Sequence, residues 1–559
     1  MNAPHHPHAR HSLADTHEVE NMPPPLSGHN LYTTDQALQE AVVRFQAQPW
    51  LGEIRDLGQR AGEVGYQQLG EDANTVQPTF RTHDRYGRRT DEVRFHPAWH
   101  TLMREALTRG LHALPWRTPQ PGAHVARAAL CYLQTQVEAG HGCPVTMTFA
   151  CVPTLRQQPD LADTWLPKIL ALDYDPRNVP FTDKKALTIG MAMTEKQGGS
   201  DVRTNSTRAY PTGQPGPGQA YELVGHKYFV SAPMSDAFLM LAYTDGGLSC
   251  FLVPRWRPDG SKNPIQLQQL KRKMGNASNA SAETELRGAL GWMVGEEGRG
   301  VRTIIEMVAL TRFDCMVGST AGMRQAVAQA IHHCTYRKAF GDYLINQPLM
   351  QSVLADLALE QEAALALSFR LAHSLDRQDD EQERLFMRLA TAVGKYWICK
   401  RTPQHAYEAM ECIGGMGVME DTPMPRLFRE SPVNAIWEGS GNVQCLDVLR
   451  AMHKSPRTVD AVMAELAPWR GHHALYDRAL DRLPTLLRQA DDLAGARTLT
   501  SQLALLLQAA TLYQAGNEQV SEAFVASRLN PDVLAHHYGT LPGHLPLRDL
   551  VDRAAPRSE

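Results

Sequence analysis

The fold is decided by the stretch Met191-Ala-Met-Thr-Glu-Lys-Gln-Gly-Gly-Ser-Asp201, which lies where a helix-rich first part of the chain gives way to a strand-rich middle part. The glycine pair at 198–199 lets the backbone approach a ligand closely, and Thr194 and Ser200 add hydroxyl donors. Asp201 can fix the turn through its side chain. The stretch therefore predicts a cradle for a polar, phosphate-bearing ligand, although a GGSD tetrapeptide alone would also suit an ordinary glycine-rich loop.

The residues before this stretch have helical patterns. DQALQEAVVRFQAQ (35–48) has Asp35 as a cap, and HTLMREALTRGLHAL (100–114) has apolar residues at helical spacing. The residues after it form short runs that are rich in aromatic and β-branched side chains and divided by turn signals. These runs are YELVGHKYFVS (221–231), AFLMLAY (237–243) and LSCFLVP (248–254), and they predict an antiparallel β domain.

Helical periodicity resumes at Val301, after the glycine-rich VGEEGRG (294–300), and continues to about residue 452. The order helix, sheet, helix predicts an α+β protein with a sheet wedged between two helical bodies. The remaining chain predicts two or three further helices. The expected divisions are a disordered tail (1–33), an N-terminal helical domain (34–185), a β domain (186–295), a C-terminal helical bundle (296–452) and a C-terminal helical extension (453–559).

Composition excludes several classes of protein. The net charge of −4 gives no bulk attraction to nucleic acid or to an anionic membrane. Nine scattered cysteines without a CxxC pair argue against a disulfide framework or a structural zinc site, and favour a reducing cytoplasm. No run of about 18 apolar residues predicts a membrane span. The histidines in the first 25 residues leave metal binding as an alternative to plain disorder, and we predict no metal site.

A second stretch, Glu411-Cys-Ile-Gly414-Gly415-Met-Gly417, continues through Arg426 to Glu430. Alone it would also suit a helix C-cap with a turn. Together the two stretches resemble the two signatures of the acyl-CoA dehydrogenase family, in the right order. This resemblance implies the acyl-CoA dehydrogenase fold and an FAD cofactor. The implied FAD-binding residues are Met191, Met193, Thr194, Gly199, Ser200, Phe229, Val230, Ser231, Arg337, Phe340, Gln347, Gly414, Gly415, Ile436, Trp437, Gly439, Ser440 and Asn442.

Two segments refine the expected cofactor site. Lys227-Tyr-Phe229-Val-Ser231 resembles the family strand in which a tryptophan packs on the flavin and a threonine hydroxyl bonds its N5; here a phenylalanine and a serine take those places. Arg337-Lys-Ala-Phe340-Gly, followed by Gln347, resembles the segment that reaches the FAD of an adjacent subunit. The resemblance therefore implies a homotetramer built as a dimer of dimers. Without it, Arg337 is a cation at a helix end.

The expected catalytic base is Glu438, within Ile436-Trp-Glu-Gly-Ser-Gly-Asn442, because this segment resembles the family's catalytic loop. A base of this kind removes the α-proton of a thioester, and burial would raise its pKa toward the working pH. A lone glutamate before glycine would otherwise be a solvated loop acid. An alternative position for the base, on an earlier helix, holds Thr311-Arg312 and offers no acid. We expect Arg312 to contact the substrate.

Long strings resemble the AidB branch of the family over about residues 28–525, including QVEAGHGCPVTMTFA (136–150) and SPVNAIWEGSGN (431–442). The extension beyond the catalytic loop is also typical of that branch, which implies DNA association in the alkylation-damage response. Residues 451–559 carry 11 Lys plus Arg against 12 Asp plus Glu, so composition does not support this role. The candidate DNA contacts are Arg450, Lys454, Arg457, Arg470, Arg478 and Arg482. Asp477 and Asp481 lie among them, and favour intrahelical ion pairs on a solvated face.

Two functions follow. The first is a DNA-associated flavoprotein with weak, isovaleryl-type acyl-CoA dehydrogenase activity, for which Ala309, where relatives commonly carry an acid, is a small supporting sign. The alternative is a metabolic dehydrogenase of a short or branched acyl-CoA without a DNA role. Both would take an acyl-CoA thioester or a related small molecule and pass electrons to an electron-transfer flavoprotein. The first would also bind double-stranded DNA.

Overall fold

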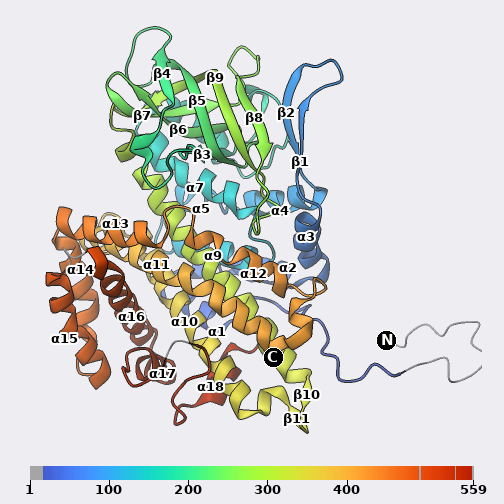
Figure 1. The fold of residues 1–559 in the computed structure, drawn as a ribbon, viewed down its shortest axis with the longest axis vertical. Coiled ribbons are helices and arrows are strands. Elements are labelled where there is room, and N and C mark those ends of the chain that lie inside the picture. The colour runs from blue at the N-terminus through green and yellow to red at the C-terminus, as the bar shows by residue number, and fades with distance from the viewer. Residues whose placement is uncertain (1–16, 490–492, 535–536, 557–559) are drawn as a thin grey trace, which may run out of the picture.

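The computed structural model describes residues 17–489, 493–534 and 537–556. In Figure 1 a β-sheet lies above a long helical bundle, and the C-terminal helices pack along one side of that bundle. The predicted order of helices, sheet and helices is therefore confirmed, but the sheet lies at one end of the helices and is not wedged between two helical bodies. The histidine-rich residues 1–16, with the alternative of metal binding, lie outside the described residues.

The N-terminal body is mostly helical, as predicted. Asp35 caps α1, since its carboxylate accepts from the Leu38 amide at 3.0 Å. The helices are α1 (Gln36–Arg44), α2 (Leu51–Gly62), α3 (Val64–Thr75), α4 (Pro97–Thr108), α5 (Leu114–Arg117), α6 (Ala123–Thr135), α7 (Gly142–Arg156) and α8 (Pro159–Ile169).

This body also contains a hairpin that the sequence did not predict, β1 (Thr79–His83) and β2 (Arg89–Arg94). Its turn is held by Asp84, whose carboxylate accepts from the amides of Tyr86 and Arg88. Gly87 takes the left-handed conformation that the turn needs, with φ of 79°. Both strands are largely charged and partly exposed, so they lack the apolar alternation that identifies a strand.

The predicted purely antiparallel sheet is corrected to a mixed one, because β3 pairs with β6 in parallel. The pairing order is β3-β6-β4-β5-β9-β7, and β6 also pairs with β7, so the strands close around a core of their own. Met191 lies in β3, so the first signature begins inside the sheet and not before it. The strands are β3 (Ile189–Ala192), β4 (Arg208–Pro211), β5 (Ala220–Ser231), β6 (Ala237–Thr244), β7 (Gly247–Pro254), β8 (Ile265–Leu270) and β9 (Ser281–Val294).

The helical bundle is built on three long helices, α9 (Gly300–Tyr336), α10 (Pro348–Asp376) and α11 (Glu381–Ile413). α9 runs from the sheet to the opposite end of the molecule, where the small hairpin β10 (Lys338–Ala339) and β11 (Asp342–Tyr343) follows it (Figure 1). Two shorter helices, α12 (Met424–Glu430) and α13 (Gly441–Lys454), flank the predicted catalytic loop.

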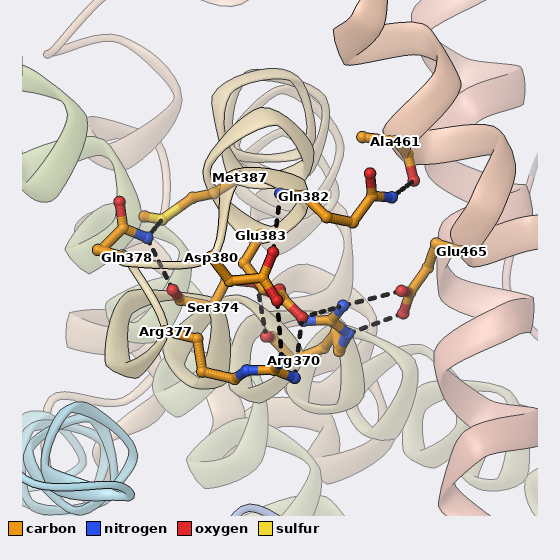
Figure 2. A network of polar contacts seen from close by, with 10 residues as sticks. All are labelled: Arg370, Ser374, Arg377, Gln378, Asp380, Gln382, Glu383, Met387, Ala461 and Glu465. Carbon is orange, nitrogen blue, oxygen red and sulfur yellow. Dashed lines mark hydrogen bonds and ion pairs between the residues drawn. The ribbon is translucent and has the colours of Figure 1, made fainter.

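The C-terminal extension contains more helices than the two or three predicted. They are α14 (Arg457–Leu466), α15 (Ala474–Arg488), α16 (Ala496–Ala515), α17 (Glu518–Arg528) and α18 (Leu547–Ala554). Figure 2 shows how α14 is joined to the bundle: Arg370 of α10 donates to Glu383 of α11 at 2.9 Å and to Glu465 of α14 at 2.7 Å. Arg370 and Glu383 are buried, so the extension completes a buried ionic network.

The predicted intrahelical pairing on α15 is wrong. Asp481 pairs with Arg470 at 2.7 Å, and Asp477 accepts from the Gly471 amide at 3.0 Å. Both partners lie in the turn before the helix. The two carboxylates therefore fix the entry into α15 and do not neutralise the arginines on it.

Part of the predicted disordered tail is held against the end of α9. The carbonyl of Asn21 accepts from Arg337, and the Asn21 amide group exchanges two hydrogen bonds with the backbone of Lys338. His332 bonds the Pro24 carbonyl at 2.8 Å. Across the described residues, the structure offers no helix with the length and apolar character needed to cross a membrane.

Candidate active site

A cavity of about 600 Å³ lies where the sheet meets α7, α9 and the predicted catalytic loop. It brings together most of the side chains singled out from the sequence. Those that line it are Met191, Met193, Thr194, Gly199, Ser200, Phe229, Ser231, Arg312, Ile436, Trp437, Glu438, Gly439, Ser440 and Arg450. Segments about 240 residues apart in the chain therefore form one site.

The glycine-rich loop is held by a buried ion pair that the sequence did not reveal. Lys227 donates to Glu195 at 2.8 Å, and both side chains are fully buried. Desolvation would raise the pKa of Glu195, but the Lys227 ammonium and the hydrogen bonds around the carboxylate lower it to about 2. The Tyr228 amide donates to the Thr194 carbonyl at 2.8 Å. These contacts fix the loop against β5.

Gly198 and Gly199 of that loop are required for different structural reasons. A Cβ on Gly198 would lie 2.0 Å from the Thr204 hydroxyl, so this residue is required by the loop's own packing and not by a ligand, as the sequence had suggested. Gly199 lines the cavity. Only the second glycine can therefore serve close approach to a bound molecule.

β5 presents an aromatic ring and a hydroxyl to the cavity at the place where its register with β9 is interrupted. Phe229 is half-exposed, and the Ser231 hydroxyl lies 3.0 Å from that of Ser281. Val230 points the other way, into the core of the sheet. Its side chain therefore does not reach the cavity, although the sequence placed it among the cofactor contacts.

Glu438 lies in a strained turn beside α9, with φ of 56°. Its carboxylate accepts from the Thr311 hydroxyl at 2.8 Å, and its backbone carbonyl accepts from Arg312 at 2.9 Å and from Gln444 at 3.0 Å. Burial raises the pKa of Glu438 above its usual value, while Thr311, Lys395 and Arg312 act in the opposite direction.

Lys395 of α11 clamps the same loop. Its ammonium donates to the carbonyls of Asn434, Trp437 and Gly439 at 2.8 to 3.0 Å. Thr311, Gln444 and Lys395 all lie outside the loop segment that the sequence singled out. Arg312 also pairs with Asp447 at 2.9 Å, so its guanidinium supports the loop as well as lining the cavity.

A second group of predicted FAD contacts lies away from this cavity. Arg337 follows the last turn of α9, 26 residues after Thr311, which corresponds to about 39 Å of helix. Phe340 is 98% exposed, and Gln347 donates to the nearby Ala339 carbonyl. These side chains cannot reach the cavity of their own chain.

Three further predicted contacts also lie outside the cavity. Gly414 and Gly415 form the exposed turn at the end of α11, where Gly414 has φ of 70°. Asn442 accepts from Arg497 of α16 at 2.8 Å. The structure thus ties the end of the predicted catalytic loop to the C-terminal extension.

The predicted DNA contacts are scattered. Arg457 pairs with Glu381 at 2.7 Å, and Arg470 pairs with Asp481. Arg450 lines the cavity and lies 3.4 Å from Asp447. The other three, Lys454, Arg478 and Arg482, are exposed.

Comparison with known proteins identifies the family. Residues 21–176 match the N-terminal domain of the adaptive response protein AidB, residues 190–289 the acyl-CoA dehydrogenase middle domain, and residues 298–453 the acyl-CoA dehydrogenase C-terminal domain. The chain is 47% identical to the acyl-CoA dehydrogenase homologue AidB of Escherichia coli (strain K12) over 512 residues, which cover 91% of this chain and 94% of that protein. The chain belongs to the acyl-CoA dehydrogenase family, in its AidB branch.

Two further relatives agree. Acyl-CoA dehydrogenase family member 11 of Caenorhabditis elegans is 31% identical over 463 residues, 79% of this chain and 73% of that protein. The solved structure of Caenorhabditis elegans ACDH-11 in complex with C11-CoA has a TM-score of 0.82 at 27% identity, and the match covers 98% of this chain and 94% of that one.

As a member of the acyl-CoA dehydrogenase family, the chain is an FAD-dependent oxidoreductase. The residues present fit this cofactor. The cavity offers the hydroxyls of Thr194, Ser200 and Ser231, an aromatic face from Phe229 and a close approach at Gly199. Its volume is in the range of cofactor pockets.

Proposed function

We propose that the chain dehydrogenates a short or branched acyl-CoA thioester at low rate, with Glu438 as the catalytic base. The observation that carries this proposal is the position of Glu438 in the same cavity as the glycine-rich loop and Ser231. Thr194, Gly199, Ser200, Phe229 and Ser231 would hold the flavin.

In this proposal the Glu438 carboxylate takes the α-proton of the thioester, and the electron pair of that C–H bond becomes part of the new double bond. Bound FAD supplies the acceptor for the hydride that leaves the β-carbon. Burial raises the pKa of Glu438 above its usual value, which makes the carboxylate a stronger base for this transfer. Thr311 orients the carboxylate, while Arg312 and Lys395 hold the loop that carries it.

The test is an anaerobic titration of the FAD-bound protein with straight-chain and branched acyl-CoA thioesters, following the loss of flavin absorbance. We expect slow reduction that is fastest with an isovaleryl-type chain, and none in Glu438→Gln. Rapid stoichiometric reduction by one thioester would favour the alternative, a metabolic dehydrogenase. Equal reduction of the variant and the wild type would refute Glu438 as the base.

The proposed assembly is a homotetramer arranged as a dimer of dimers. It is supported by the exposed Phe340 at the far end of α9, together with Leu349, which is 85% exposed. Arg337, Phe340, Gln347 and the exposed turn at 414–415 would then contact the FAD of a neighbouring subunit. Sedimentation of the FAD-bound protein tests this assembly, and a monomer that retains FAD would contradict it.

We further propose double-stranded DNA as a weak partner, within a response to alkylation damage. The support is the AidB-type sequence over 91% of the chain together with the extension. Because Arg457 and Arg470 are neutralised, about three exposed cations per chain remain from the predicted set, namely Lys454, Arg478 and Arg482. With about 0.9 counterions released per phosphate contact, the logarithm of the binding constant should fall with a slope near −2.7 per protomer. Fluorescence anisotropy of a labelled duplex across a salt series measures this slope.

The remaining proposals concern the environment of the protein. All nine cysteines carry free thiols, which supports a cytoplasmic location. Electrons from the reduced cofactor would pass to an electron-transfer flavoprotein, as its place in an FAD-dependent dehydrogenase family suggests. Reduction of such a partner by the substrate-reduced protein would test this transfer.

A further inference from the structure

One wall of the cavity carries a cation that the proposed dehydrogenation does not use. Lys273, between β8 and β9, lines the cavity next to Ser231 and Ser281. Its ammonium donates to the Asn279 carbonyl at 2.5 Å and to the Ser281 hydroxyl at 3.0 Å. No carboxylate of the described residues lies within 4.0 Å of it, so its charge is not neutralised by an ion pair.

The Lys273 ammonium gives the hydrogen bonds of this group a preferred direction. An ammonium can only donate, so the Ser281 hydroxyl accepts from Lys273 and its own hydrogen is free to point to Ser231 at 3.0 Å. The Ser231 oxygen then accepts, and its hydrogen can point into the cavity, where the Cys143 thiol beside it is the competing acceptor. A neutral amine or an apolar residue at position 273 would remove this order, because either hydroxyl could then donate to the other.

We propose that Lys273 is a positioning residue, which aligns the Ser281 and Ser231 hydroxyls so that Ser231 donates a hydrogen bond to the flavin and which places a positive charge behind that bond. This inference rests on the proposed placement of the flavin against Ser231. A cation at this position favours the reduced, more negative form of the cofactor. It therefore raises the flavin reduction potential.

Several groups face the Lys273 ammonium. They are Cys143 of α7, Glu138 in the turn before α7, and Glu430 at the end of α12. Burial lowers the pKa of Lys273 to about 8, against the attraction of these groups, and burial raises the pKa of the Cys143 thiol to about 12. The pKa of Glu430 is raised by burial and by Glu138 to about 7. Between pH 8 and pH 10 Lys273 is therefore the group of this set that loses its charge.

The experiment compares the reduction potential and the visible spectrum of the FAD-bound protein in matched variants. We expect Lys273→Met to lower the potential and shift the flavin absorption, and Lys273→Arg to keep both close to wild type. The control is Lys262→Met, because Lys262 is a partly buried lysine of the same β domain that faces Asp91 and does not line the cavity. An unchanged potential and spectrum in Lys273→Met would overturn the proposal, as would an equal shift in Lys262→Met.

Three further measurements complete the test. If Lys273→Met does not retain FAD, Ser281→Ala breaks the link at small structural cost, and it should shift the spectrum in the same way; an unchanged spectrum there also overturns the proposal. The flavin reduction potential of the wild type should fall below that of Lys273→Arg as the pH rises past 8. If the potentials of the two proteins change in parallel with pH, the proposal is contradicted. Ser231→Ala distinguishes a wrong flavin placement from a wrong role for Lys273. If this variant leaves the flavin spectrum unchanged, the proposed placement of the flavin against Ser231 is itself wrong.

Discussion

The Thr311–Glu438 hydrogen bond makes a quantitative prediction about the pH dependence of the reaction. Thr311→Val removes the hydroxyl that lies 2.8 Å from the Glu438 carboxylate and keeps the shape of the side chain. A hydrogen bond to a charged group contributes about 1.5–3 kcal/mol, and 1.36 kcal/mol corresponds to one pKa unit, so the full effect would be about one to two units. The single hydroxyl hydrogen is shared with the Val308 carbonyl at 3.0 Å. The lower end, a rise of about one unit in the pKa of Glu438, is therefore expected.

The direction of the shift in the pH profile follows from the role of Glu438 as a base. Glu438 must be ionised to accept the α-proton, so the reduction rate rises as the pH passes its pKa. The Thr311 hydroxyl favours the ionised carboxylate, so its loss raises the pKa of Glu438. The acid limb of the rate profile should therefore move to higher pH by about one unit. Above both pKa values, the rate constants of variant and wild type should converge.

Anaerobic stopped-flow reduction of the flavin by a saturating thioester, repeated from pH 5 to pH 9, measures this limb. Thr320→Val is the matched control, since Thr320 is a buried threonine of the same helix that donates to the Met316 carbonyl at 2.8 Å and does not line the cavity. Superimposable profiles for Thr311→Val and wild type, or a shift toward acid, would refute the assigned contact between Thr311 and the base.

Three further outcomes are expected. Glu438→Gln should keep its flavin absorbance and lose thioester-driven reduction; dithionite should still bleach it, which separates a lost base from a damaged flavin site. Arg337→Ala should lose part of its FAD on purification, read as a lower ratio of absorbance at 450 nm to that at 280 nm, and full occupancy would mean that no neighbouring FAD depends on it. Lys395→Met leaves the Asn434 and Trp437 carbonyls without their side-chain donor, at a cost of about 1–3 kcal/mol each where they stay dry, while the Gly439 carbonyl keeps Gln444. Urea unfolding should therefore show a lower free energy of unfolding, and an unchanged midpoint would show that water replaces the ammonium.

The parts of the site that could be predicted are those that lie within one short segment. Thr194, Ser231 and Glu438 each belong to a local pattern, and the structure places all three in one cavity. Thr311 of α9 and Lys395 of α11 lie about 130 and 40 residues before the catalytic loop in the chain, and no spacing in the sequence links them to it. Their role depends on tertiary packing, which a single sequence does not show.

The same limit explains the errors in the fold. Helices and core strands were predicted because apolar periodicity identifies them. The hairpin β1–β2 was missed because its register is held by Asp84 and Gly87 and not by apolar alternation. The parallel pairing of β3 with β6 depends on strand order, which local pattern does not contain. Arg457 and Arg470 were candidate DNA contacts until their partners, Glu381 and Asp481, were placed beside them.

The ionic network around Arg370 joins the C-terminal extension to the helical bundle, so the two parts cannot be separated without loss of buried contacts. Cutting the chain after α13 would remove Glu465 and leave one buried guanidinium facing a single carboxylate, while the apolar faces of α10 and α11 would be exposed to water. A truncated chain of that kind should aggregate and not behave as a smaller dehydrogenase. The extension and the catalytic body therefore form one folding unit, and a substitution that unfolds either part should lower the yield of the whole chain.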